Sequence, residues 1–104
     1  MTKAYIEKVD TGCHVMLIDH ADGSPEVCAA ISCLAYTLAG WLANNQVKVY
    51  EKQLEPGFVS IRFAKTHDSE VAFDVFCIGL LQLENSFPDY LKVKSYGDLW
   101  GETE

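Results

Sequence analysis

The chain has 104 residues and a formal net charge of −7, from 15 acidic and 8 basic residues. Hydrophobic residues make up 49% of it, which is enough to bury one core and argues against disorder. The acidic balance argues against binding nucleic-acid phosphates or an anionic membrane, and it is compatible with a basic polypeptide partner. The polar-apolar pattern after Met1 is unlike a signal peptide, and the most apolar segment contains Ser32 and Asn44. We therefore expect a cytoplasmic protein with no membrane span.

The first half of the chain predicts a hairpin followed by a long helix. Residues 3–9 and 13–19 have strand patterns and flank a turn signal at residues 10–12. Apolar residues then recur at helical spacing over residues 25–44. This helix is apolar on nearly every side, so we expect it either to be deeply buried or to contact a second copy of the chain.

The second half repeats that order. Strand patterns at residues 47–50 and 59–63 flank the turn signal at 55–57. A second helix is expected to begin at a cap on Asp68 or Ser69 and to run to about residue 85. The apolar residues that recur along one side of this helix are Val71, Val75, Ile78, Leu81 and Leu83.

The element order is β-β-α-β-β-α, and Tyr90, Leu91 and Val93 add a possible short C-terminal strand. This order predicts an α+β fold with two layers, in which two helices cover one face of a mainly antiparallel sheet. We expect one domain over residues 1–94 and a C-terminal tail over residues 95–104.

One of the four cysteines has the surroundings of a nucleophile. Ser24 suits the N-cap position and Pro25 the first helical position, so Cys28 is expected in the first turn region of the helix. There the helix dipole favours a thiolate, and the free N–H groups of that turn would face a developing oxyanion. His20 lies eight residues earlier, and the turn signal at Asp22 and Gly23 could bring its imidazole beside the thiol.

The other cysteines have plainer explanations. Cys33 and Cys77 lie in apolar helical runs, and Cys13 begins a strand. No spacing among the cysteines and histidines is that of a zinc site, so we expect no metal and no cofactor.

The segment around these residues resembles the Prp (YsxB-like) family of ribosomal-processing cysteine proteases. Its pattern is His-Ala, a short loop and Cys-Ala-Ala-Val-Ser, which His20-Ala21 and Cys28-Ala29-Ala30-Ile31-Ser32 match. Residues 79–81 and 87–91 are similar to the family's second helix and the turn after it. Asp19 stands where the family has glycine, and the loop between histidine and cysteine is shorter.

The resemblance implies a homodimeric cysteine endopeptidase with a Cys-His dyad. Such a protein removes a short N-terminal extension from a large-subunit ribosomal protein, as part of ribosome biogenesis, or processes a phage capsid or scaffold protein with a similar cleavage sequence. A prophage origin is compatible with the second role. The catalytic pair would be His20 and Cys28, Ser32 and Asp19 would support it, and the substrate-binding loop would be Ala21, Asp22, Gly23 and Ser24.

The sequence is also compatible with two other interpretations of Cys28. One is a dimeric binding protein that keeps the fold and clamps a ribosomal or phage polypeptide without cleaving it. The other is a redox-sensing thiol, although no resolving cysteine is placed obviously for it. Ser32 could equally bond to the helix carbonyl one turn back.

Overall fold

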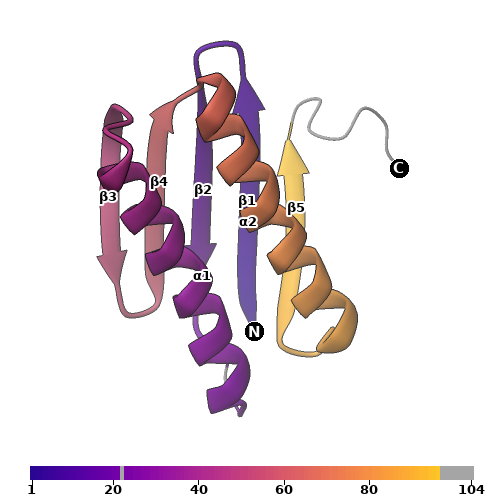
Figure 1. Cartoon of the computed structure of the whole chain (residues 1–104). Helices are drawn as coiled ribbons and strands as arrows, with labels where there is room; N and C mark the ends of the chain where they lie inside the picture. Colours follow the sequence, from indigo (N-terminus) through magenta and orange to yellow (C-terminus); the bar gives the residue numbers. More distant parts are fainter. Residues whose placement is uncertain (22, 97–104) are drawn as a thin grey trace.

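The structure is a computed structural model, and it describes residues 1–21 and 23–96, with the backbone alone for 95 and 96. In chain order the elements are β1 (Thr2–Val9), β2 (Gly12–Ile18), α1 (Pro25–Asn44), β3 (Val49–Glu55), β4 (Phe58–Ala64), α2 (His67–Ser86) and β5 (Leu91–Tyr96) (Figure 1). The predicted order is confirmed. β5 extends two residues into the segment assigned to the tail, and residues 97–104 lie outside the described part of the chain.

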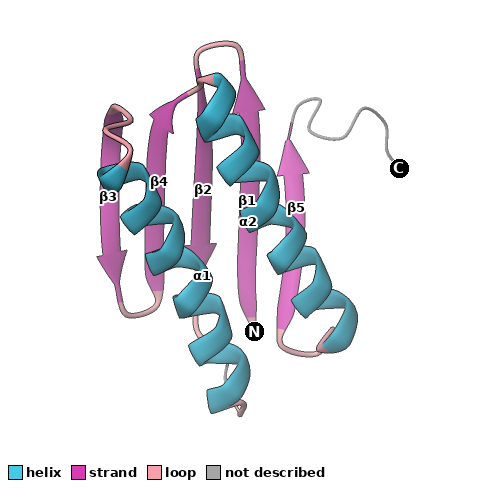
Figure 2. Cartoon of the chain, in the orientation of Figure 1, coloured by secondary structure: helices cyan, strands magenta, loops and turns pink. Residues whose placement is uncertain are grey.

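The five strands form one sheet in the order β3-β4-β2-β1-β5. β1–β2, β2–β4 and β3–β4 are antiparallel pairs, and β5 pairs in parallel with β1. Both helices lie on the same face of this sheet (Figure 2). The predicted α+β class, with two layers and a mainly antiparallel sheet, is therefore confirmed.

α1 begins where the sequence places it, because Ser24 caps it. The Ser24 hydroxyl accepts a hydrogen bond from the Val27 N–H at 3.3 Å, and Pro25 occupies the first helical position. By length and mean hydropathy alone, α1 is long and apolar enough to cross a membrane, although the sequence analysis expects no membrane span. Here one side of it packs in the core, through Val27, Ile31, Ala35, Leu38, Ala39 and Leu42.

The cap of α2 differs from the prediction. Thr66 is the N-cap, and its hydroxyl accepts from the Ser69 N–H at 3.0 Å, while the Ser69 hydroxyl accepts from the Thr66 N–H at 2.7 Å. This reciprocal pair is a capping box, in which a short hydroxyl side chain replaces the usual Glu or Gln. The choice of Asp68 or Ser69 as the cap was therefore wrong, since Ser69 is the third helical residue.

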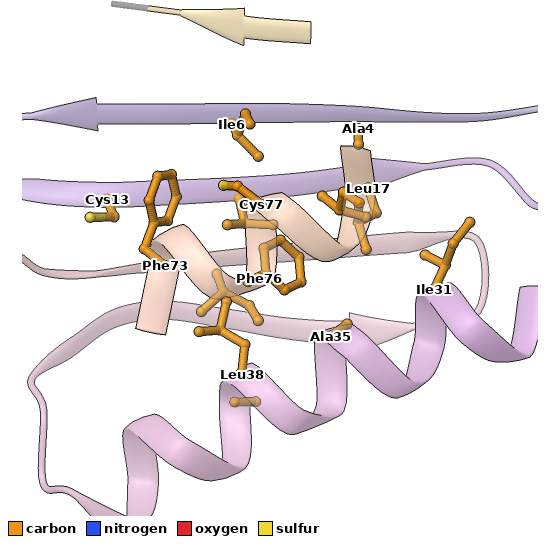
Figure 3. Close-up of a cluster of buried hydrophobic side chains, with 14 of the residues drawn as sticks. Ala4, Ile6, Cys13, Leu17, Ile31, Ala35, Leu38, Phe73, Phe76 and Cys77 are labelled. Atoms are coloured by element: carbon orange, nitrogen blue, oxygen red, sulfur yellow. The ribbon is translucent and has the colours of Figure 1, made fainter. Parts of the chain in front are cut away.

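The side of α2 that faces the core is also not the one marked by its valines. Val71 and Val75 are 53% and 63% exposed, whereas Phe73 and Phe76 are 0% and 3% exposed. Figure 3 shows Phe73, Phe76 and Cys77 packed among strand residues and α1 residues. Both sides of α2 are apolar, so periodicity could not choose between them, and the aromatic side fills the space over the sheet because its side chains are larger.

This orientation of α2 gives a matched pair of substitutions. Phe73→Ala should lower the free energy of unfolding by about 3–5 kcal/mol, because it removes a fully buried ring and leaves a cavity. Ile78→Ala should change it by less than about 1 kcal/mol, because the Ile78 side chain is 49% exposed on the other side of the helix. Urea denaturation followed by circular dichroism measures both. Equal losses in the two variants would contradict the orientation.

Candidate active site

The site begins at a turn that ends β2. Asp19 has φ of +71°, in the left-handed region that glycine adopts freely and aspartate tolerates. Two hydrogen bonds hold its backbone there: its N–H donates to the Gly57 carbonyl at 2.9 Å, and its carbonyl accepts from the Thr2 hydroxyl at 2.9 Å. Asp19 therefore lies outside the strand. The left-handed conformation also gives a physical reason for the glycine that the resemblance places at this position.

The turn lays His20 over the hairpin between β3 and β4. A Cβ atom on Gly57 would lie 3.0 Å from His20 Nε2, so the imidazole packs directly on the Gly57 backbone. Gly57 has φ of +78° and follows Pro56, a pairing that suits a tight turn. The hairpin thus forms the support on which the imidazole rests.

Cys28 lies opposite, on α1, and is half-buried. Its N–H donates to the Ser24 carbonyl at 3.1 Å, and the Val27 N–H donates to the Ser24 hydroxyl. Pro25 has no N–H, so the Glu26 N–H is the remaining donor among the residues of this turn. The sequence interpretation expected several free N–H groups here, but the Ser24 cap uses most of them.

His20 and Cys28 line one cavity of about 280 Å³ between α1 and the end of the sheet. Asp19 and Ser32 line it too, so the structure brings together the four residues named as catalytic or supporting. In the described part of the chain, no hydrogen bond joins the Cys28 thiol to the imidazole. Hydrogen bonds between catalytic groups are often long before the substrate binds. The lack of a bond between these two described side chains is therefore compatible with a dyad that forms when a peptide binds.

Sequence reasoning did not identify most of the cavity wall. These residues come from the N-terminus, β2, α1 and the β3–β4 hairpin: Thr2, Leu17, Ile31, Ala35, Tyr36, Leu54, Glu55, Pro56, Gly57, Phe58 and Val59. The turn signal at residues 55–57 was visible, but its contact with His20 depends on the order of strands in the sheet.

Three of the residues named as a substrate-binding loop, Ala21, Gly23 and Ser24, are not among those that line the cavity. Ala21 is 3% exposed and belongs to the core, and Ser24 is buried as the cap of α1. Gly23 is exposed with φ of +88°, and like the other two it does not line the cavity. Asp22 lies outside the described residues.

The remaining thiols and histidines have other surroundings. Burial raises the pKa of Cys13 to about 11 and also raises the pKa of Cys77. Burial, with the Arg62 charge, lowers the pKa of His14, whose ring is 3.1 Å from the Ser60 hydroxyl. Residues 1–21 and 23–96 contain no group of three metal-ligating side chains. Cys33 is exposed on α1, which makes it an internal reference for Cys28.

The turn at Asp19 can be tested by separating backbone conformation from charge. Asp19→Gly and Asp19→Asn should change the free energy of unfolding little, because both residues tolerate the left-handed region. Asp19→Val should lose about 1–2 kcal/mol, because its branched side chain is strained there. Thermal and urea denaturation measure the three variants. An equal loss in Asn and Val would assign the effect to the carboxylate instead.

No family model matches the chain. The ribosomal processing cysteine protease Prp of Mycoplasma genitalium is 28% identical to it over 71 residues, which are 68% of this chain and 72% of that protein. Two crystal structures of Prp from S. aureus, one with a covalently linked product peptide and one with a substrate peptide, match with TM-scores of 0.81 and 0.77. Each is 16% identical and covers 92% of this chain and 100% of its own, a likeness that shows the fold. The resemblance to the Prp family is therefore confirmed, in sequence by the mycoplasma protein and in fold by the staphylococcal structures.

Proposed function

We propose that this protein is a cysteine endopeptidase that removes a short N-terminal extension from a large-subunit ribosomal protein. The observation that carries the proposal is the shared cavity, in which Cys28 on α1 and His20 after β2 face one space large enough for part of a peptide. The relative from M. genitalium is named a ribosomal processing cysteine protease, which supports the reaction and the class of substrate.

In the proposed mechanism the Cys28 sulfur attacks the scissile carbonyl carbon. His20 takes the thiol proton and then donates it to the amine as the peptide C–N bond breaks, which leaves a thioester on Cys28. Water attacks the thioester, with His20 as the base, and the carboxylate product leaves as the thiol is restored. The reaction consumes one water molecule and needs no metal or cofactor.

Two donors on α1, one on either side of Cys28 in the sequence, are assigned to the developing oxyanion. The Glu26 N–H lies at the N-terminal end of α1, where the helix dipole stabilises negative charge. Ser32 lines the cavity one turn after Cys28, and we assign its hydroxyl a supporting role at the thiolate or the oxyanion. Asp19 supports the imidazole chiefly through the turn that its backbone makes.

The substrate is a polypeptide. The staphylococcal Prp structures hold a substrate peptide and a product peptide, which supports a peptide in the equivalent cavity here. All four cysteines are free, which is compatible with the reducing cytoplasm that we propose as the location. A phage capsid or scaffold protein with a similar cleavage sequence is the alternative substrate within the same mechanism.

Peptide hydrolysis tests the reaction. One synthetic peptide spans the N-terminal extension of the ribosomal protein from the same organism, and a second spans the start of a phage capsid protein. Wild type should cleave the ribosomal peptide at one bond, as mass spectrometry would show. Cys28→Ala should abolish turnover and His20→Ala should lower kcat/KM by about 10²–10⁴-fold. Cys33→Ala, a cysteine of the same helix, is the matched control, and undiminished turnover in Cys28→Ala would exclude the scheme.

Thiol alkylation distinguishes a protease from a protein that only binds the polypeptide. With iodoacetamide at neutral pH, Cys28 should react faster than Cys33, although Cys33 is the more exposed of the two. His20→Ala should slow Cys28 and leave Cys33 unchanged. Mass spectrometry of timed samples measures both rates in one experiment. A Cys28 rate below that of Cys33, together with peptide binding, would favour the binding protein.

We also propose that the protein is a homodimer, as the resemblance implies. The exposed valines of α2 border an apolar groove of about 360 Å³ that also contacts Leu34 and Trp41 of α1. Exposed apolar surface of this kind commonly marks an interface.

Light scattering after size exclusion tests the dimer. Wild type should have the mass of two chains, and Val75→Glu should have the mass of one, because it places a charge in the groove wall. Val9→Glu, at an exposed valine on β1, should remain dimeric. A monomeric wild type, or a dimeric Val75→Glu, would reject this interface.

A further inference from the structure

We propose that the substrate binds as an additional β-strand along the outer edge of β3, paired with the backbone of Leu54 and Lys52. This inference rests on the proposed function and adds the mode of substrate binding to it. An extended peptide that adds a strand to a sheet gains affinity from main-chain hydrogen bonds, whatever its side chains are.

The two edges of the sheet differ in how open they are. β3 and β5 are the edge strands, on opposite sides of the sheet (Figure 1). On β5, the Val93 N–H donates to the Glu84 carboxylate at 3.0 Å, so a side chain of α2 already occupies that edge. A carboxylate at this place blocks a new strand. Within the described chain, no side chain bonds to the backbone of β3.

The register of the hairpin shows which groups of β3 face outward. Glu55 pairs with Phe58 across the two-residue turn, and Gln53 pairs with Ser60. Residues that flank a two-residue turn exchange hydrogen bonds with each other, and bonded and non-bonded pairs then alternate along the strand. The N–H and C=O groups of Glu55 and Gln53 therefore face β4, and those of Leu54 and Lys52 face the open edge.

This edge leads into the site. Leu54 and Glu55 line the same cavity as Cys28, and the Leu54 side chain is half-buried against the core. Tyr36, 60% exposed on α1, lines the cavity as well. A strand paired with Leu54 would thus lie in the plane of the sheet beside the cavity wall, and its side chains on the α1 side of the sheet would point toward the cavity.

An irregularity limits the length of the pairing. The register of β3 shifts between Val49 and Glu51, which bends the strand there. The regular edge therefore comprises the residues from Glu51 to Glu55, and its last two residues line the cavity. A short pairing of this kind fits a site that must release both products after cleavage.

A scan of the peptide backbone tests the pairing without changing the protein. Each amide of a cleaved peptide is N-methylated in turn, and kcat/KM is measured with wild type. Strand pairing predicts losses at alternate positions on one side of the scissile bond, of about five- to tenfold for each lost hydrogen bond. Uniform losses, or none, would overturn the inference while leaving the protease intact. If wild type cleaves no peptide, both the function and the inference fail.

Two substitutions at one position give the complementary test. Leu54→Pro removes an outward N–H and no bond to β4, so the hairpin should still form. It should weaken peptide binding to the Cys28→Ala background, measured by fluorescence anisotropy, by about tenfold or more, whereas Leu54→Val should bind nearly as well as Leu54. Amide hydrogen exchange provides a second measurement. The exchange rates of the Leu54 and Lys52 N–H groups should fall when the peptide binds. Equal binding by the Pro and Val variants, with unchanged exchange, would reject edge pairing.

Discussion

The hydrogen bonds on either side of Asp19 are the constraint on which the site depends. The Thr2 hydroxyl holds the Asp19 carbonyl, and the Gly57 carbonyl holds the Asp19 N–H. Together they keep one residue in a left-handed conformation at the end of β2, so the next side chain turns onto the β3–β4 hairpin. Without that turn, His20 would continue along the strand. Three separate parts of the sheet thus fix one imidazole.

The second half of the site depends on a helix start. The Ser24 hydroxyl accepts a hydrogen bond from the Val27 N–H, and the Ser24 carbonyl accepts one from the Cys28 N–H. A single residue therefore sets both the direction of α1 and the position of the thiol. The same bonds leave one first-turn donor, on Glu26, for a ligand. Helix capping and the binding of an oxyanion both use the N–H groups of the first helical turn. Here most of those N–H groups donate to Ser24.

Local rules predict the elements of this fold well and their faces less well. Pro25 and Ser24 define the start of α1, because capping is a property of neighbouring residues. The prediction of which side of α2 is buried was wrong, because both sides are apolar. The volume available above the sheet places Phe73 in the core and leaves Val75 exposed. Similarly, a short motif predicts that His20 and Cys28 lie near each other, and both line one cavity. The contact of Gly57 with His20 depends instead on tertiary structure that no motif encodes.

The position of Thr2 has a practical consequence for handling the protein. Its hydroxyl donates to the Asp19 carbonyl, its N–H donates to the Tyr90 carbonyl, and the residue lines the cavity. Any affinity handle fused ahead of Met1 would therefore leave the fold beside the cavity mouth, tethered at a high effective concentration. If the cavity binds the proposed peptide substrate, the fused handle would compete with it, so kinetic measurements call for complete removal of the handle.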